Sequence, residues 1–294
     1  MKIFRNFVLL IFLVSSLYSE NKDYFSFGLS ISDYSIDDQN RIKNLSLGLL
    51  KKLNEENPID INITFYENEE KLLEDFKNKK NINTLILSTQ FYYDNRELIK
   101  KISKKPYIYR ANESKNSQLL MIANKKSKIT SINDIKDKLF ANSLYMRNNS
   151  AWLDYMTLKK IKKTYTQLIK EESLSTKAST ALLDVYFNKA DFCIIDKDMY
   201  EDMLILNPSL KKNLTIIEKS DEIFFFAFTA VHNDVSDESL IVLDDFFTNK
   251  EFKSSFREFF KLISLNSITA IEFKDFDKIE QFYSEYQNLK KKYP

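Results

Sequence analysis

The chain has few of the residues on which common catalytic and cofactor-binding motifs depend. Its 294 residues include two glycines, one histidine and one cysteine. The two glycines are isolated, at Gly28 and Gly48, which excludes a glycine-rich phosphate loop and a dinucleotide fingerprint. The single His232 excludes zinc sites that need two imidazoles, and the single Cys193 excludes an intramolecular disulfide and a cysteine-rich cluster. We therefore expect neither a metal site nor a cofactor.

Nucleophilic and acid–base catalysis also lack a motif. His232 follows a hydrophobic segment without a nearby partner motif, which favours a residue at the surface end of a strand. Cys193 stands among apolar residues, whereas a reactive thiol needs an accessible, electropositive setting. Carboxylate doublets such as Glu69-Glu70 are typical of solvated helix faces. We predict no catalytic residues and no enzyme.

Residues 1–19 have the pattern of a cleaved secretory signal. Lys2 and Arg5 precede an unbroken apolar run over residues 7–14, which is too short to span a membrane, and serines follow it. The alternative is an uncleaved amino-terminal anchor. No cysteine stands near the cleavage region, so a lipid anchor is not expected. The pattern predicts a periplasmic protein.

The mature chain has a balanced charge. The full sequence carries 44 basic and 42 acidic residues, for a formal net charge of +2. Loss of Lys2 and Arg5 with the signal brings this net charge to zero. A neutral exported protein has no broad electrostatic attraction to nucleic acid, so no nucleic-acid partner is expected.

Hydrophobic periodicity alternates between strand and helix along the chain. Phe25, Phe27, Leu29 and Ile31 repeat at period two, and apolar residues over 42–53 then repeat at helical spacing. Such alternation predicts an α/β fold with mainly parallel sheets covered by helices on both faces. Two runs of this kind, followed by an all-helical segment after Ser236, predict two lobes and a helical C-terminus.

The sequence has no flexible linker between the two runs, so strands are expected to cross directly from one lobe to the other. The crossings are predicted at residues 110–118 and 219–223. The resulting domain prediction assigns residues 20–112 and 223–294 to lobe 1 and residues 113–222 to lobe 2.

Polar clusters at three predicted strand-to-helix turns are the candidates for ligand binding. In such folds ligands lie beyond the carboxyl ends of the strands, where helix N-termini offer free N–H groups to anions. The alternative for each cluster is plain N-capping. Tyrosines without clear periodicity, Tyr92, Tyr93, Tyr107 and Tyr109, are further candidates for cleft contacts. The three clusters are Ser88-Thr89-Gln90, Asn148-Asn149-Ser150 and Ser175-Thr176-Lys177, the last followed by Ser179 and Thr180.

Two longer segments resemble motifs of the phosphate/phosphonate-type solute-binding proteins of ABC importers. Residues 128–136, KITSINDIK, are similar to the step that precedes the first strand of lobe 2 in that family. Residues 180–191, TALLDVYFNKAD, resemble the family's helix-to-strand step, most clearly at the NKAD end. The resemblance extends over nearly the whole mature chain as an order of elements and implies the type II periplasmic binding protein fold.

The resemblance also implies ligand residues. The family's hydroxyl-rich anion turn falls on Asn148, Asn149 and Ser150, of which Ser150 alone keeps a hydroxyl. Lys177 stands beside the position of the family's histidine, near Ala178. The remaining positions implied are the acids Asp196 and Asp198, and the cleft residues Ser88 and Thr89. The family's acid before the return strand has no counterpart, because residues 224–226 are all phenylalanine.

The resemblance implies an exported solute-binding protein, and we expect it to be a monomer. Such a protein captures a small polar or oxyanion ligand by hinge closure between two lobes and delivers it to an ABC permease. The alternatives are a periplasmic sensor for a membrane signalling protein, an enzyme on the same fold, and an exported scaffold without a small ligand.

Overall fold

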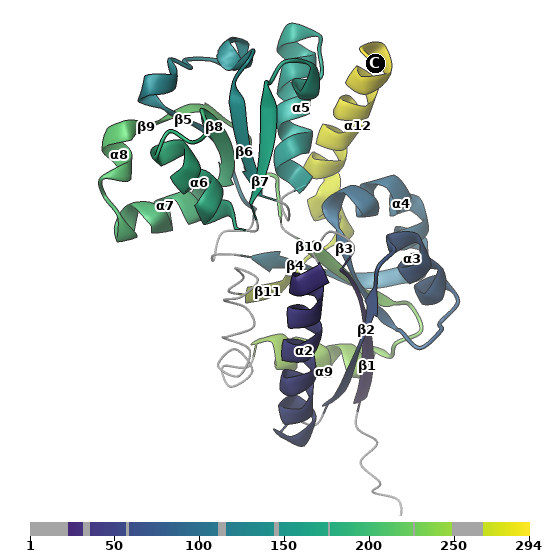
Figure 1. Cartoon of the computed structure of the whole chain (residues 1–294). Helices are drawn as coiled ribbons and strands as arrows, with labels where there is room; N and C mark the ends of the chain where they lie inside the picture. The colour runs from purple at the N-terminus through teal and green to yellow at the C-terminus, as the bar shows by residue number, and fades with distance from the viewer. Residues whose placement is uncertain are drawn as a thin grey trace, which may run out of the picture.

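A computed structural model describes residues 23–31, 36–56, 59–110, 116–143, 147–175, 177–225, 227–248 and 267–294. The predicted signal, residues 1–19, and Thr176 lie outside the described residues. Two mixed sheets, each flanked by helices, form two lobes stacked end to end (Figure 1). This arrangement confirms the predicted two-lobed α/β class.

The sheet of lobe 1 has the order β11-β4-β10-β3-β1-β2. β1, β2 and β3 are parallel, whereas β10 pairs antiparallel with both β3 and β4, and β11 pairs antiparallel with β4. Four of these six described strands therefore point the same way. The strands are β1 (Asp23–Ser30), β2 (Ile59–Tyr66), β3 (Thr84–Ser88), β4 (Ser103–Arg110), β10 (Ala227–His232) and β11 (Ser267–Ala270).

The sheet of lobe 2 has the order β7-β6-β8-β5-β9. β6, β7 and β8 are parallel, and β5 runs antiparallel to its neighbours β8 and β9. The carboxyl ends of β6, β7 and β8 consequently meet at one edge of the sheet. The strands are β5 (Leu119–Asn124), β6 (Leu139–Ser143), β7 (Glu171–Ser175), β8 (Phe192–Asp196) and β9 (Leu214–Lys219).

Helices cover both faces of each sheet. In lobe 1, one apolar face packs with α2 and α9 and the other with α3 and α4. In lobe 2, α6 and α7 cover one face and α5 covers the other. The helices are α2 (Ile36–Glu56), α3 (Glu69–Lys77), α4 (Thr89–Ile102), α5 (Arg147–Ile161), α6 (Ala178–Tyr186), α7 (Lys197–Leu206), α8 (Leu210–Asn213), α9 (Asp237–Thr248) and α12 (Asp277–Lys292).

The alternating pattern of β1 explains how one strand serves both faces of its sheet. Phe25 and Phe27 pack in the cluster that α2 and α9 cover. Gly28 points to the opposite face, where a Cβ would come within 2.2 Å of Leu72 Cδ1 on α3. The absence of a side chain at Gly28 therefore lets α3 lie close against β1.

The chain crosses between the lobes twice, after β4 and after β9, within the segments where the sequence predicts crossings. The two crossing segments run side by side, because Ser117 and Phe224 form an antiparallel bridge. The backbone N–H of Ser117 donates to the carbonyl of Phe224 over 2.7 Å. Paired crossing segments of this kind form a two-stranded hinge.

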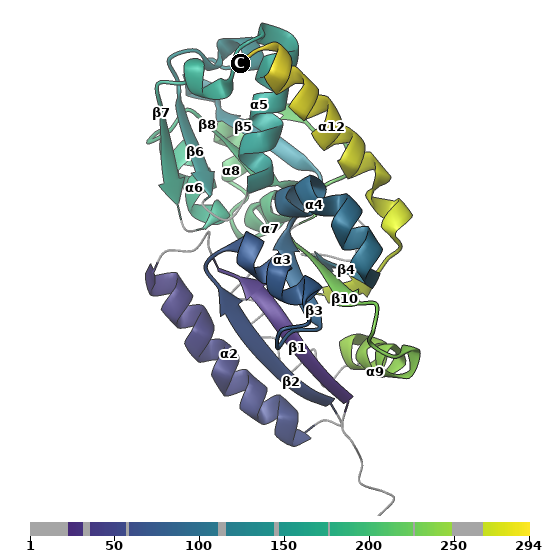
Figure 2. The ribbon, with the colours of Figure 1, turned by 90° about the vertical axis from the view of Figure 1, so that its right-hand side faces the viewer.

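Helix α12 lies along both lobes. It starts beside α4 of lobe 1 and runs along α5 of lobe 2 to the C-terminus (Figure 2). Phe282, Tyr283 and Tyr286 are buried in one apolar cluster together with residues of α4 and α5. The C-terminal helix, which the sequence prediction assigns to lobe 1, thus also contacts lobe 2 on the side that carries the hinge.

Three expectations from the sequence are wrong. The chain is not all-helical after Ser236, since β11 adds a strand to lobe 1. Tyr107 and Tyr109 are strand residues of β4, buried under α9, and do not line a cleft. His232 is only 6% exposed at the end of β10, where burial lowers its pKa. The polar residues and proline at the start of β4 interrupt the alternating apolar pattern by which the sequence would have predicted this strand. They are Lys104, Lys105 and Pro106.

Within the described residues, no helix is long and apolar enough to cross a bilayer.

Candidate functional site

The first predicted cluster lies at the N-terminus of α4, directly after β3. Ser88 is the N-cap, and its hydroxyl accepts from the Phe91 N–H at 3.3 Å. Thr89 is buried, and its hydroxyl donates to the carbonyl oxygen of Phe225 over 3.1 Å. Ser88 therefore performs the capping role that the sequence left as the alternative, and Thr89 ties the helix to the segment that returns from lobe 2.

The second cluster lies at the N-terminus of α5, after β6 in lobe 2. The side-chain amide of Asn148 donates to the same Phe225 carbonyl over 3.0 Å. Because Thr89 and Asn148 share this acceptor, the first turns of α4 and α5 meet beside the return segment. The first N–H groups of an α-helix have no partner within the helix, and its N-terminus is the positive end of the helix dipole. Two such ends, one from each lobe, converge at this point.

Arg147 and Glu69 add a charged pair where the helix N-termini converge. Arg147 begins α5, and its Nη1 lies 3.1 Å from Oε2 of Glu69 and 3.4 Å from Oγ of Ser88. Glu69 is in the first turn of α3, is only 7% exposed, and accepts the Ser88 N–H at 3.2 Å through Oε1. The interpretation of Glu69 as a solvated helix charge is therefore wrong.

Neither Arg147 nor Glu69 is predicted as a site residue from the sequence. Their positions in the sequence could have indicated a site, because each stands at a strand-to-helix turn. Glu69 follows β2, and Arg147 immediately precedes Asn148. Only the fold brings together these residues, which are 78 positions apart in the chain.

Asn149 and Ser150 belong to a buried polar network behind the helix end. Asn149 is fully buried, and its amide donates to the carbonyl of Ile194 over 2.9 Å and to Oδ1 of Asn142 over 3.2 Å. The hydroxyl of Ser150 accepts from the amide of Asn142 at 2.8 Å. That amide also donates to Glu172 over 2.8 Å. These contacts fix α5 against β6, β7 and β8.

The third cluster lies at the N-terminus of α6, which follows β7. Lys177 is the N-cap residue, and its side chain is exposed and makes no capping hydrogen bond. Ser179 is half-buried in the first turn. Because β6 and β7 are parallel neighbours, α5 and α6 begin at the same edge of the lobe 2 sheet. The Lys177 side chain is therefore exposed at that edge and makes no capping hydrogen bond.

Asp196 and Asp198 lie at the same edge, after β8. The Asp196 carboxylate caps α7 by accepting the N–H groups of Asp198 at 2.9 Å and Met199 at 3.4 Å. Burial, and secondarily the nearby Asp198 charge, raise the pKa of Asp196 to about 6. Asp198 is half-buried in the first turn of α7.

Tyr92, predicted from the sequence as a ligand contact, does not face the cleft. Its side chain is fully buried between Phe228 and Phe276, with ring centroids 4.6 and 4.7 Å away. Its hydroxyl donates to Oε1 of Glu280 on α12 over 2.6 Å, and burial raises its pKa. Tyr92 lies on the inward-facing side of α4, and it therefore connects α4 to the C-terminal helix.

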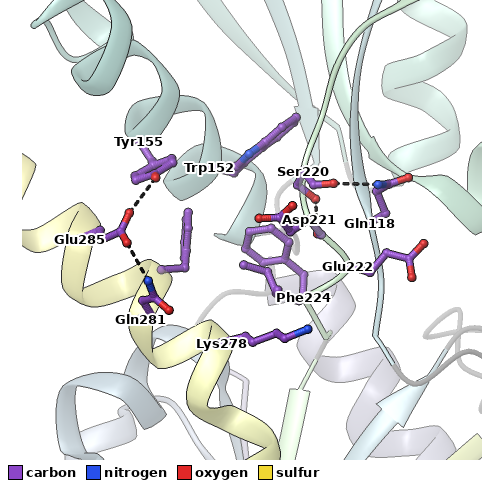
Figure 3. A pocket seen from close by; sticks show the side chains of 12 residues that line it. Gln118, Trp152, Tyr155, Ser220, Asp221, Glu222, Phe224, Lys278, Gln281 and Glu285 are labelled. Carbon is purple, nitrogen blue, oxygen red and sulfur yellow. Dashed lines mark hydrogen bonds between the residues drawn. The ribbon is translucent and has the colours of Figure 1, made fainter.

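A cavity of about 680 Å³ lies on the hinge side of the molecule (Figure 3). Its walls come from α5, α12 and the two crossing segments, with Trp152 and Phe282 among the aromatic residues and Asp221 and Glu285 among the acids. None of the predicted ligand residues lines it. Among the described residues, no group of His, Cys, Asp and Glu is placed to hold a metal ion.

The two lobes, the paired crossing segments and the helix N-termini between them define a two-lobed periplasmic binding protein. Residues 34–276 match the family model described as "ABC transporter, phosphonate, periplasmic substrate-binding protein". The chain belongs to this family, and the resemblance found in the sequence is confirmed. A comparison with curated protein sequences finds no match.

Solved structures similar to this chain share its fold. One is a binding protein component of an ABC phosphonate transporter from Pseudomonas aeruginosa, with 19% identity, a TM-score of 0.59, and 92% and 88% of the two chains covered. Another is PhnD1 from Prochlorococcus marinus in complex with methylphosphonate, with 14% identity, a TM-score of 0.59, and 91% and 99% covered. A third is a Xanthomonas citri protein bound to ATP, with 10% identity, a TM-score of 0.61, and 92% and 98% covered.

Proposed function

We propose that this protein captures a phosphonate-class oxyanion between its lobes and delivers it to the permease of an ABC importer. The observation that carries the proposal is the meeting of two helix N-termini, α4 of lobe 1 and α5 of lobe 2, with the Arg147 guanidinium beside them. Helix N-termini and guanidinium groups are favoured partners of phosphate-like anions.

The proposed ligand contacts come from both lobes. Ser88 and Thr89 belong to lobe 1, whereas the remaining proposed residues belong to lobe 2. A ligand held from both sides stabilises the closed arrangement, because only that arrangement makes all contacts at once. The lobe 2 residues are Asn148, Ser150, Lys177, Ser179, Asp196 and Asp198. Asn149, also predicted from the sequence, is fully buried behind the helix end and is not among the proposed contacts.

The proposed boundaries and location follow the sequence. Residues 1–19 direct export to the periplasm and are removed, residues 20–112 and 223–294 form lobe 1, and residues 113–222 form lobe 2. The mature protein acts as a monomer without catalytic activity. The permease recognises the surface of the closed, ligand-bound form.

Thermal unfolding of residues 20–294 with a ligand panel tests the proposal. The panel contains methylphosphonate, other alkylphosphonates, phosphate, phosphite, sulfonates and amino acids. A ligand at 100 times its dissociation constant adds about 2.7 kcal/mol and raises the melting temperature by a few degrees. A shift with phosphonates alone supports the proposal. A folded protein that responds to no oxyanion contradicts it and leaves the sensor and scaffold alternatives.

A further inference from the structure

The proposed anion site already holds an anion, which belongs to the protein itself. The two carboxylate oxygens of Glu69 take different donors, the Ser88 backbone N–H at 3.2 Å and the Arg147 guanidinium at 3.1 Å. The first donor belongs to lobe 1 and the second to lobe 2. The carboxylate therefore bridges the lobes at the point where a bound oxyanion would bridge them.

Burial makes this interaction more than a surface ion pair. Glu69 is 7% exposed, although its partner Arg147 has a side chain that is 40% exposed. A buried carboxylate needs both a charge partner and hydrogen bonds, and Glu69 has them. It also stands in the first turn of α3 and beside the first turn of α4, where helix dipoles favour negative charge.

A ligand oxyanion requires the same donors. It cannot take the Nη1 donor of Arg147 and the Ser88 N–H while the Glu69 carboxylate holds them, and two anions on one guanidinium repel each other. When the binding-competent state is only a fraction of the population, the apparent affinity falls by that fraction. A ligand anion that binds these two donors must therefore compete with Glu69.

We propose that Glu69 is an internal competitor for the ligand, which gains Arg147 and the Ser88 N–H only by displacing this carboxylate. The inference rests on the proposed function and adds its regulation. Glu69 lowers the affinity for weak or singly charged anions and leaves the site to ligands whose oxyanion outcompetes a carboxylate. It also holds the lobes together in the absence of ligand.

The test compares Glu69→Gln with a matched control, Glu70→Gln. Both changes remove one negative charge from the first turn of α3, but Glu70 is exposed. Glutamine keeps the size of Glu69 and an acceptor for the Ser88 N–H while weakening the hold on Arg147. We expect calorimetric titration with methylphosphonate to show at least about tenfold tighter binding for Glu69→Gln. The control should stay within about twofold of the unmodified protein, because its charge is screened by solvent.

Glu69→Asp provides a second variant, because it keeps the charge but shortens the reach by one methylene group. It should also bind methylphosphonate more tightly, by a smaller factor than Glu69→Gln. Thermal unfolding without ligand confirms that each variant is folded.

The outcomes separate this inference from the proposed function. If the unmodified protein binds methylphosphonate and neither Glu69 variant binds it more tightly, the inference is overturned and the function stands. If only Glu69→Gln binds, both are supported. If neither methylphosphonate nor phosphate binds to any folded form, the oxyanion function fails and the inference fails with it.

Discussion

Tyr283 of α12 donates its hydroxyl proton to Oδ1 of Asn148, at the N-terminus of α5, over 2.7 Å. The amide of the same asparagine donates to Phe225 in the return segment. The last helix of the chain thus holds the helix end that we propose binds the ligand. The ring of Tyr283 also stacks on Tyr93 of α4, with the ring centroids 5.2 Å apart.

Replacing Lys177 by alanine should weaken methylphosphonate binding about three- to fivefold without destabilising the fold. The side chain is exposed and caps nothing, so its loss removes only an attraction that is worth about 1 kcal/mol in water at close range. Lys189→Ala is the control, because it removes an exposed lysine just after the other end of α6. Equal titration curves for both variants would place Lys177 outside the site.

Asp196→Asn should make stability less dependent on pH. Its folded pKa of about 6 lies above the unfolded value of 3.8, so the native state binds more protons between these values. The unmodified protein should therefore lose about 2 kcal/mol of stability as pH rises from 4 to 6. Asparagine keeps an acceptor for the α7 cap and removes the charge.

Urea unfolding at pH 4, 6 and 8 checks this prediction. The variant should be more stable than the unmodified protein at pH 8 and should show a flatter profile across the three values. A fall in stability for Asp196→Asn at pH 8 would mean that the carboxylate cap outweighs the burial of its charge.

Tyr286→Phe should destabilise the protein by about 1–3 kcal/mol. The Tyr286 hydroxyl donates to Oδ2 of Asp154 over 3.0 Å, and that carboxylate is only 4% exposed. Removing the donor leaves a buried charged oxygen with one contact fewer. Chemical denaturation measures the change in the free energy of unfolding.

Tyr155→Phe is the matched control for this tyrosine. It also removes a hydroxyl that bonds α5 to α12, but the acceptor Glu285 is exposed. Water replaces the lost donor there, so the change should stay below about 0.5 kcal/mol. Similar losses for the two variants would show that burial of Asp154 does not govern the effect.

The two glycines should respond to alanine with opposite signs. Gly48 lies inside α2 with nothing within 4 Å of an added Cβ, so Gly48→Ala should stabilise the protein by about 0.5–1 kcal/mol. At Gly28 the new methyl group would lie 2.2 Å from Leu72 and 2.9 Å from Ile82 side-chain carbons. Gly28→Ala should cost about 1–3 kcal/mol through overpacking. Melting temperatures of the two variants give the comparison.

Periodicity in the sequence predicts the elements well where both faces of a segment are regular. It places β1, whereas polar turn residues mark the helix starts at Ser88 and in the Asn148 region, and the lack of a linker indicates the two crossings. It fails at β4, whose lysines and proline conceal that Tyr107 and Tyr109 alternate toward a buried face. It also fails at Glu69, because a carboxylate doublet at a helix start gives no local sign that a turn 19 residues away supplies a hydrogen bond.

The candidate site is predicted in part for the same reason. Turn chemistry locates the helix N-termini of lobe 2, since each follows a strand and begins with polar residues. Which side chains face the partner lobe depends on how the lobes pack, and local sequence does not encode that. For this reason Arg147, which is not predicted from the sequence, reaches across to lobe 1, whereas the predicted Tyr92 points into the core.

The position of β10 has a consequence for how the exported chain reaches its final form. This strand lies between β3 and β4, although more than a hundred residues, including all of lobe 2, separate it from either in the sequence. A chain that emerges from its amino terminus presents β3 and β4 long before their shared neighbour arrives, with both strand edges unpaired. Non-local pairing of this kind is slow and exposes such edges to other chains. The sheet of lobe 1 therefore stays incomplete until lobe 2 has been synthesised and residues 227–232 pair between β3 and β4.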